Sequence, residues 1–140
     1  LRSGGDSEPA EQLGDIIHAF GLVSVQIDVE GSLPDDARIA AAFLQIIREA
    51  STNATKHAQA HQVQVRLWQE APDGCAVARM TISNDGAPAP VSYREGTGIP
   101  GMRHVARDLD GSLEVHAAPP FTLEVSIPLS PDVTVQRRSS

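Results

Sequence analysis

A stripe of apolar residues with helical spacing constrains the fold more than any other feature of this sequence. Between Asp35 and Ala60, apolar side chains recur with a period near 3.6 residues, which predicts one long amphipathic helix. The residues of this stripe are Ile39, Phe43, Ile46, Ile47, Ala50 and Ala54. Because such a helix must bury its apolar side, the neighbouring segments should form a layer that packs against it.

Segments before and after the long helix alternate between apolar and polar residues, which is typical of half-buried β-strands. The expected strands are residues 23–29, 63–67, 77–83, 112–116 and 122–128. The turn at residues 71–74 joins the second and third strands into a hairpin, and shorter helices are expected at residues 11–20 and 100–109. This order predicts an α+β fold, a two-layer α/β sandwich whose mixed, mostly antiparallel sheet is covered on one face by helices.

The composition is that of a single globular domain. The 140 residues match the usual length of one domain, and we expect a domain at residues 11–130 between a flexible leader, 1–10, and a loose tail, 131–140. The net charge of −7 argues against contact with nucleic acid or an anionic membrane, because both need clustered cations. Cys75, the one cysteine, excludes an internal disulfide, and no apolar stretch approaches the ~20 residues of a membrane span.

Polar side chains with complementary chemistry lie late in the long helix. Glu49 and Asn53 are spaced i and i+4, and Lys56 or His57 follows at i+7 or i+8, so an α-helix places the row on one side, beside the apolar stripe. A carboxylate can orient a nucleophile, an amide oxygen can ligate Mg²⁺, and a cation can neutralise phosphate. Taken alone, the same row also fits a solvated helix face with one polar pair.

A glycine-rich turn runs directly into the last predicted helix. Its sequence is Gly96-Thr97-Gly98-Ile99-Pro100-Gly101-Met102. Backbone N–H groups at such a helix start bind phosphate, and the glycines let a ligand approach the backbone closely. The spacing G-x-G-x-x-G also matches a dinucleotide-binding fingerprint, but residues 88–95 lack the pattern of the strand that must precede this fingerprint.

An amide and an acid follow each other at the end of the predicted strand 77–83. The side chain of Asn84 or Asp85, just before Gly86, can accept a hydrogen bond from an exocyclic amine, as a pocket for a purine base requires. The same three residues are also a common turn sequence. The spacing leaves both side chains as candidates for reading the base.

These three features, in this order, resemble the nucleotide-binding domain shared by gyrase, heat-shock chaperones, histidine kinases and MutL, which has the Bergerat fold. The resemblance is closest to the catalytic, ATP-binding domain of bacterial sensor histidine kinases. Residues 49–58 resemble the asparagine box of these kinases. Residues 96–103, followed by 110–113, resemble the glycine box and strand of the nitrate-sensor and DesK-like subfamily, whose short ATP lid also fits this sequence. The resemblance covers residues 12–129.

The resemblance implies a single pocket for Mg²⁺ and ATP, walled by the long helix and the glycine turn. It implies nucleotide-binding roles for Asn53, Lys56, His57, Asn84, Asp85, Gly86, Gly96, Thr97, Gly98, Ile99, Gly101, Met102 and Thr122. Among these, Asn53 would ligate Mg²⁺ and Asn84 would read adenine, while Glu49 would orient or deprotonate an incoming histidine. The chain departs from the family where Asn84 replaces the adenine-reading Asp, where Pro88 replaces a glycine, and where only the threonine, Thr122, of a usual Gly-Thr pair remains.

The resemblance also implies partners that lie outside this chain. The phosphate-accepting histidine is expected on a separate dimerisation domain of the same kinase, which forms the homodimer, and a response regulator is expected downstream. The domain would be cytoplasmic in a parent protein anchored in the bacterial cell membrane. Three alternatives stay open: an anti-sigma-factor serine kinase, an ATP-hydrolysing conformational switch, and a degenerate interaction module that binds no nucleotide.

Overall fold

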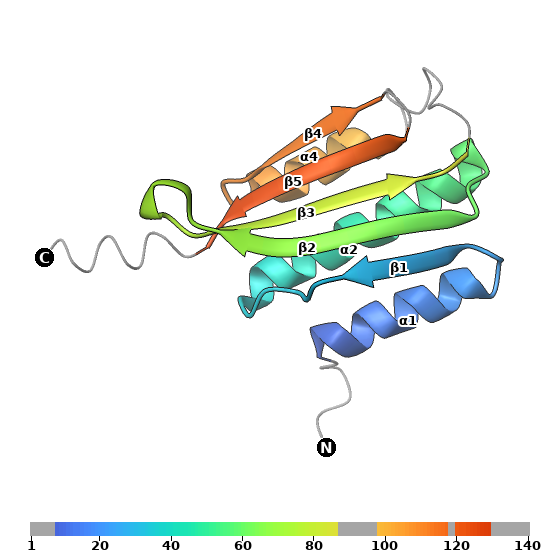
Figure 1. Ribbon diagram of the computed structural model, residues 1–140, viewed down its shortest axis with the longest axis horizontal. Coiled ribbons are helices and arrows are strands. Elements are labelled where there is room, and N and C mark those ends of the chain that lie inside the picture. Colours follow the sequence, from blue (N-terminus) through green and yellow to red (C-terminus); the bar gives the residue numbers. More distant parts are fainter. Residues whose placement is uncertain (1–7, 87–97, 118–119, 130–140) are drawn as a thin grey trace, which may run out of the picture.

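A five-stranded sheet forms one layer of the molecule and the helices form the other (Figure 1). The computed structural model describes residues 8–86, 98–117 and 120–129. The helices are α1 (Pro9–Gly21), α2 (Ala37–Asn53) and α4 (Ile99–Arg107), with a π-helical turn, η1 (Ala54–Ala58), after α2 and a short 3-10 turn, η2 (Pro72–Gly74). The strands are β1 (Gln26–Glu30), β2 (Gln62–Glu70), β3 (Val77–Asn84), β4 (Ser112–His116) and β5 (Phe121–Pro128).

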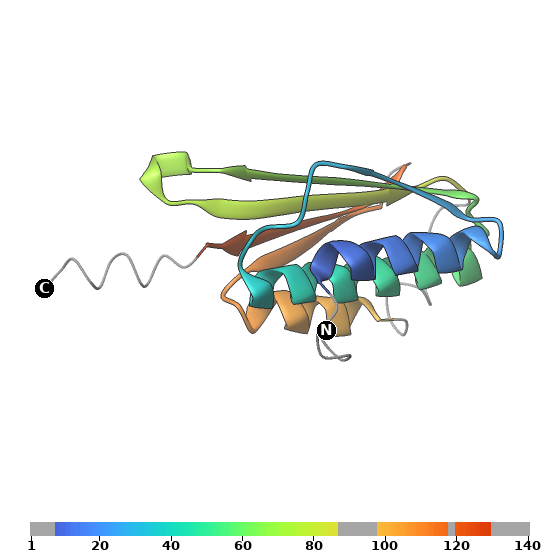
Figure 2. The same cartoon turned by 90° about the horizontal axis from the view of Figure 1, so that it is seen from below.

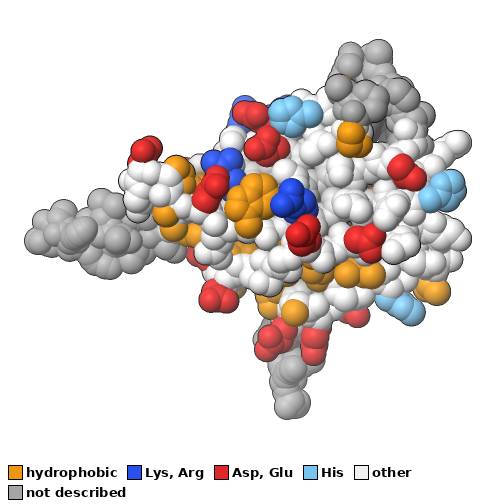
Figure 3. Space-filling view, in the orientation of Figure 1, with side chains coloured by type: hydrophobic (Ala, Val, Ile, Leu, Met, Phe, Trp, Pro, Cys, Tyr) orange, Lys and Arg blue, Asp and Glu red, His pale blue; other side chains and the backbone are white. Residues whose placement is uncertain are grey.

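The sheet is mixed and mostly antiparallel, which confirms the predicted fold class. Its strand order is β1-β2-β3-β5-β4. β1 and β2 run parallel, whereas the other three neighbouring pairs are antiparallel. All of the helices lie on one side of the sheet (Figure 2). Charged side chains are spread over the opposite face (Figure 3).

The core lies between α2 and the inner face of the sheet. Every residue of the predicted apolar stripe is buried, and Ile46 and Ile47 are fully enclosed. The sheet residues that face the helices include Val63, Val65, Leu67, Ala78, Met80, Ile82, Leu123, Val125 and Ile127. Burial of each large apolar side chain contributes about 1.5–3 kcal/mol, so this contact orients α2 and with it the polar residues on its flank.

The ends of α2 are set by local hydrogen bonds. Asp36 precedes the helix, and its Oδ1 accepts hydrogen bonds from the backbone N–H groups of Arg38 and Ile39, at 2.9 and 3.2 Å. At the other end the α-helix changes to the π-turn η1, which Gln59 terminates in a left-handed conformation with φ of 54°. The sequence predicted one helix to residue 60, whereas the α-helical part ends at Asn53.

Other boundaries also differ from the sequence prediction, and those of α1 and β1 have clear local causes. α1 begins at Pro9 instead of residue 11, because proline suits the first turn of a helix. β1 begins at Gln26 instead of residue 23, since the chain turns through Ser24 with φ of 67° and leaves Val23 59% exposed. Residues 1–7 and 130–140, which carry most of the predicted leader and tail, lie outside the described residues. Among the described helices, none is long and apolar enough to cross a membrane.

Candidate functional site

The side chain of Glu49 touches the glycine that begins α4. Gly98 has φ of 107°, in the left-handed region that favours glycine, and a Cβ atom built there would lie only 2.5 Å from Oε2 of Glu49. Both features of the glycine therefore matter, its backbone conformation and its missing side chain. The carboxylate lies beside the start of a helix, where the positive end of the helix dipole favours negative charge. The late part of α2 and the glycine turn, which are 49 residues apart in sequence, thus meet at one place.

Asn53 lies one helical turn after Glu49, on the same flank of α2. Glu49 is half-buried, whereas Asn53 is only 4% exposed. Among the described residues, Asn53 and Ser51 are the two buried polar side chains. Burial fixes the position of a carboxamide, and its oxygen is a hard ligand of the kind that Mg²⁺ takes together with phosphate oxygens. The donor chemistry at Asn53 therefore fits the predicted magnesium role.

Lys56 and His57 belong to the π-turn and not to the α-helix. A π-turn holds more residues than an α-helical turn, so these two residues do not keep the angular spacing on which the predicted row depended. Lys56 is exposed. The side chain of His57 lies outside what the structure describes. The α-helical part of the row consists of Glu49 and Asn53.

The glycine turn offers its backbone more than its side chains. Ile99 and Met102 are buried in the core, and the Met102 N–H donates to the Gly98 carbonyl at 2.8 Å to close the first turn of α4. The N–H groups of Ile99 and Gly101 come before the Met102 N–H in the chain. They therefore lie in the first turn of the helix, where helices bind anions. Gly101 is exposed, and a Cβ built there would meet no atom of the other described segments within 4 Å. Gly96 and Thr97, which the sequence also assigned to this site, lie outside the described residues.

At the end of β3, Asn84 and Asp85 take different positions. Asn84 follows Ile82 at the two-residue period of the strand, so it lies on the helix-facing side of the sheet, half-buried. Its Nδ2 donates to the Asp85 carbonyl at 2.6 Å. The Asp85 carboxylate accepts hydrogen bonds from the backbone N–H groups of His61 and Gln62, both at 2.9 Å. These bonds, that from Gln62 above all, lower the pKa of Asp85.

Asn84 and Asp85 therefore differ in surroundings: Asn84 is half-buried on the helix-facing side, whereas Asp85 is held at the surface by two backbone N–H groups. Asp85 is exposed, and its Oδ1 links the end of β3 to the start of β2. Gly86 follows with φ of 102°, which carries the chain away from the strand. The structure therefore gives Asp85 a local structural role that the sequence did not predict.

Thr122 does not join the residues around Glu49, which corrects the sequence prediction. In β5 it alternates with the buried Phe121 and Leu123, so it lies on the outer face of the sheet, away from the helices. Its Oγ1 donates to the Pro120 carbonyl at 2.8 Å. Phe121, 4% exposed, is the residue paired with Asn84 across the sheet. The alternation of Leu123, Val125 and Ile127 could have revealed this inward position.

Comparison with known proteins identifies the fold. No family model and no curated protein matches this sequence. The histidine kinase domain of a blue-light activated histidine kinase from Erythrobacter litoralis is similar in structure, with a TM-score of 0.66 and 23% identity over 91% of this chain and 62% of that one. A second structure of the same kinase gives a TM-score of 0.65 and 23% identity over 86% of this chain and 44% of that chain.

A third similar structure is an isolated domain. The ATP-binding domain of PrrB from Mycobacterium tuberculosis has a TM-score of 0.61 and 16% identity, over 85% of this chain and 90% of that one. This chain therefore has the fold of histidine kinase ATP-binding domains. It spans less than two thirds of the two Erythrobacter litoralis structures.

Proposed function

We propose that this chain is the ATP-binding catalytic domain of a two-component sensor histidine kinase of the nitrate-sensor and DesK-like type. One observation carries the proposal: the carboxylate of Glu49 lies against Gly98 at the start of α4, with Asn53 buried one turn further along α2. A phosphate held by the first turn of α4 would then lie close to a carboxylate and an amide oxygen. This combination suits phosphoryl transfer, which depends mainly on positioning and charge stabilisation.

Different residues of the chain would contact Mg²⁺, the phosphates and the adenine base. Asn53 would hold Mg²⁺ through its side-chain oxygen, and the bound ion would neutralise charge on the phosphates. The N–H groups of Ile99 and Gly101 would donate to phosphate oxygens, and Lys56, with His57, would add positive charge. Asn84 would accept a hydrogen bond from the adenine amine, which an amide oxygen can do as an aspartate does.

Glu49 would act on the histidine that receives the phosphoryl group. Its Oε2 would accept the N–H proton of that imidazole, or a hydrogen bond from it, while the other ring nitrogen attacks the γ-phosphorus. The bond from this phosphorus to the β–γ bridging oxygen would break, and ADP would leave. This histidine belongs to the dimerisation domain of the same kinase, and a response regulator would then receive the phosphoryl group. The fold neighbours, which are histidine kinase domains, support the assignment of this chain as an ATP-binding kinase domain.

Titration of the chain with an ATP analogue, with and without Mg²⁺, tests the nucleotide site. Asn53→Ala should abolish the part of the affinity that depends on Mg²⁺. Thr52→Ala is the matched control, because the Thr52 hydroxyl donates to the Arg48 carbonyl of its own helix, at 2.9 Å. Unchanged magnesium dependence in Asn53→Ala would rule out the metal assignment. If the chain without any substitution binds no nucleotide, it would instead be a degenerate interaction module.

Phosphotransfer to an added dimerisation domain tests the catalytic role. Glu49→Gln keeps the shape of the side chain but removes its basicity, so the rate should fall by about 100-fold or more while nucleotide affinity stays within about twofold. Acid-labile phosphate on the acceptor would establish a phosphohistidine. Acid-stable phosphate would establish a serine kinase of the anti-sigma-factor type in place of a histidine kinase.

A further inference from the structure

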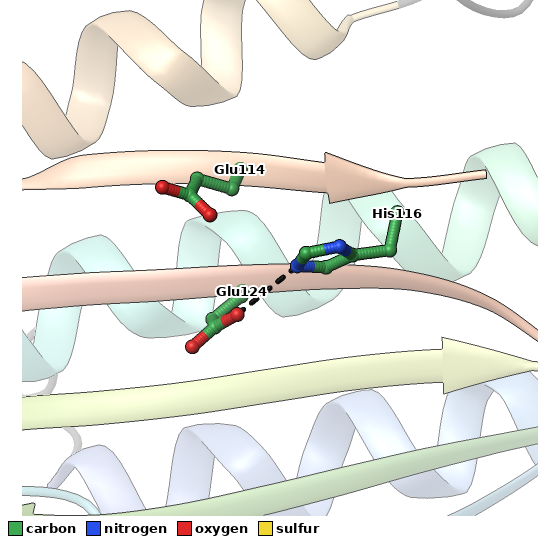
Figure 4. A group of neighbouring side chains, drawn as sticks. All are labelled: Glu114, His116 and Glu124. Atoms are coloured by element: carbon green, nitrogen blue, oxygen red, sulfur yellow. Dashed lines mark hydrogen bonds and ion pairs between the residues drawn. The ribbon is translucent and has the colours of Figure 1, made fainter. Parts of the chain in front are cut away.

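Three side chains that can ligate a metal ion gather on the outer face of the sheet, away from the helices. They are Glu114 and His116 of β4 and Glu124 of β5, and their side chains point toward one another in Figure 4. Each offers one ligand atom, and these atoms all lie within 4.8 Å of one another. Nε2 of His116 lies 3.0 Å from Oε1 of Glu124.

The register of the two strands holds this cluster together. Glu114 lies directly opposite Glu124 across the antiparallel pair, and His116 follows two residues later on the same face. Because both strands belong to the hydrogen-bonded sheet, the three side chains start from fixed backbone positions. The cluster thus has the rigid support that a small binding site needs.

The two opposed carboxylates repel each other unless a cation lies between them. Arg79 is the one lysine or arginine paired with Glu124 among the described residues, through Nη1 at 3.8 Å from Oε2. Arg79 also forms a closer ion pair with Glu70, so its charge is shared. Within the same described part of the chain, no lysine or arginine is paired with Glu114. The cluster therefore carries more negative charge than its neighbours offset.

We propose that Glu114, His116 and Glu124 bind one divalent transition-metal ion, for which Zn²⁺ is the probe. One imidazole nitrogen and two carboxylate oxygens are ligands that Zn²⁺ accepts, with water in the remaining position. Ligand atoms about 2.0–2.2 Å from a tetrahedral Zn²⁺ ion lie about 3.3–3.6 Å apart. The Glu114 side chain is exposed, so it has room to turn toward the other two ligands when an ion binds. Mg²⁺ and Ca²⁺ favour oxygen ligands alone, so the imidazole selects against them.

Binding there would join the edge strand to the body of the sheet. Among the described strands, β4 pairs with β5 alone and is the last strand of the sheet. An ion held by ligands from both strands would link them through their side chains as well as their backbones. This site shares no residue with the proposed nucleotide site.

Titration of the metal-free chain with Zn²⁺, in competition with a chromophoric chelator, tests the proposal. One Zn²⁺ should bind per chain, and His116→Gln and Glu124→Gln should each lower the affinity at least about 10-fold. The control is His104→Gln, because His104 and Asp108 form an exposed pair at 3.5 Å, with no third ligand among the described residues. His104→Gln should leave the affinity unchanged.

Three outcomes would overturn the proposal. The first is parental Zn²⁺ affinity in His116→Gln with an unchanged circular dichroism spectrum. The second is displacement of Zn²⁺ by millimolar Mg²⁺, which would identify a weak carboxylate site only. If His116→Gln does not fold, Glu114→Gln is measured in its place, because Glu114 is exposed. The third outcome is a Zn²⁺ affinity in Glu114→Gln equal to that of the unsubstituted chain.

Discussion

At the scale of single residues, the fold and the proposed chemistry both depend on the absence of a side chain at Gly98. The absence of a Cβ lets the Glu49 carboxylate lie against the backbone, and the positive φ starts α4 at that place. A glycine in a glycine-rich turn is usually explained by ligand approach alone. Here it is also required by a neighbouring side chain of the protein itself.

Replacing Gly98 with alanine should therefore disturb both stability and activity. The positive φ should cost about 1–3 kcal/mol in free energy of unfolding, and the added methyl group should displace the Glu49 carboxylate. Gly101→Ala is the matched control, since the added Cβ would meet no atom of the other described segments within 4 Å and alanine favours a helix by up to about 1 kcal/mol. Urea denaturation of both variants checks this prediction. Equal stability of the two variants would contradict it.

Replacing Asn84 and Asp85 by alanine, one at a time, should have different effects on nucleotide affinity and on stability. Asn84→Ala should weaken nucleotide binding with little effect on stability, because Asn84 lies on the helix-facing side at the end of β3. Asp85→Ala should leave nucleotide affinity unchanged but lower stability by at most about 1 kcal/mol, since solvent screens the exposed carboxylate that accepts two backbone hydrogen bonds. Loss of affinity in Asp85→Ala alone would reverse the two roles.

The stability lost in Asp85→Ala should depend on pH in a defined direction. Hydrogen bonds lower the pKa of Asp85 in the folded state, so its contribution is fully present above the unfolded pKa of about 3.9. It should disappear as pH falls through the lower, folded pKa. Unfolding curves of the parent chain and the variant should therefore differ at pH 7 and converge in acid.

At the scale of elements, α2 positions the site, and its two ends differ in how well the sequence predicted them. The predicted start at Asp35 is close to the observed start at Ala37, which Asp36 caps. The change to a π-turn after Asn53 could not be predicted, because the apolar stripe ends at Ala54 and the residues beyond it carry no periodic signal. The roles assigned to Lys56 and His57 assumed a continuous α-helix and remain predictions.

Asp36→Ala should destabilise the whole domain by about 1 kcal/mol, because it removes the acceptor for two N–H groups at the start of α2. Asp35→Ala provides the control, since Asp35 is the exposed acid immediately before it. Thermal unfolding of both variants measures the difference. If both lose the same stability, charge near the helix start and not the hydrogen bonds of Asp36 would explain the loss.

At the scale of the whole molecule, the fold was predictable and the outer-face cluster was not. Helix and strand periods, in their order along the chain, define the layers, because burial repeats along each element. The pairing of Glu114 with Glu124 depends on strand order and register, which are set by contacts between distant segments. Thr122 shows the same limit at one position. Its hydroxyl suggested a contact with the nucleotide, whereas the alternation of buried residues along β5 places it on the outer face.

The parallel pairing of β1 with β2 has a consequence for how such a chain can vary in length. The chain must return along the sheet between these two strands, and α2 makes that return. Inserting or deleting one residue within α2 before Glu49 would rotate that side chain by about 100° relative to the part of the helix before the change, and so away from Gly98. Insertions in the exposed η2 hairpin, residues 72–74, would leave the meeting point of the two segments untouched. Length changes among relatives of this chain should therefore occur in that hairpin and spare the return helix.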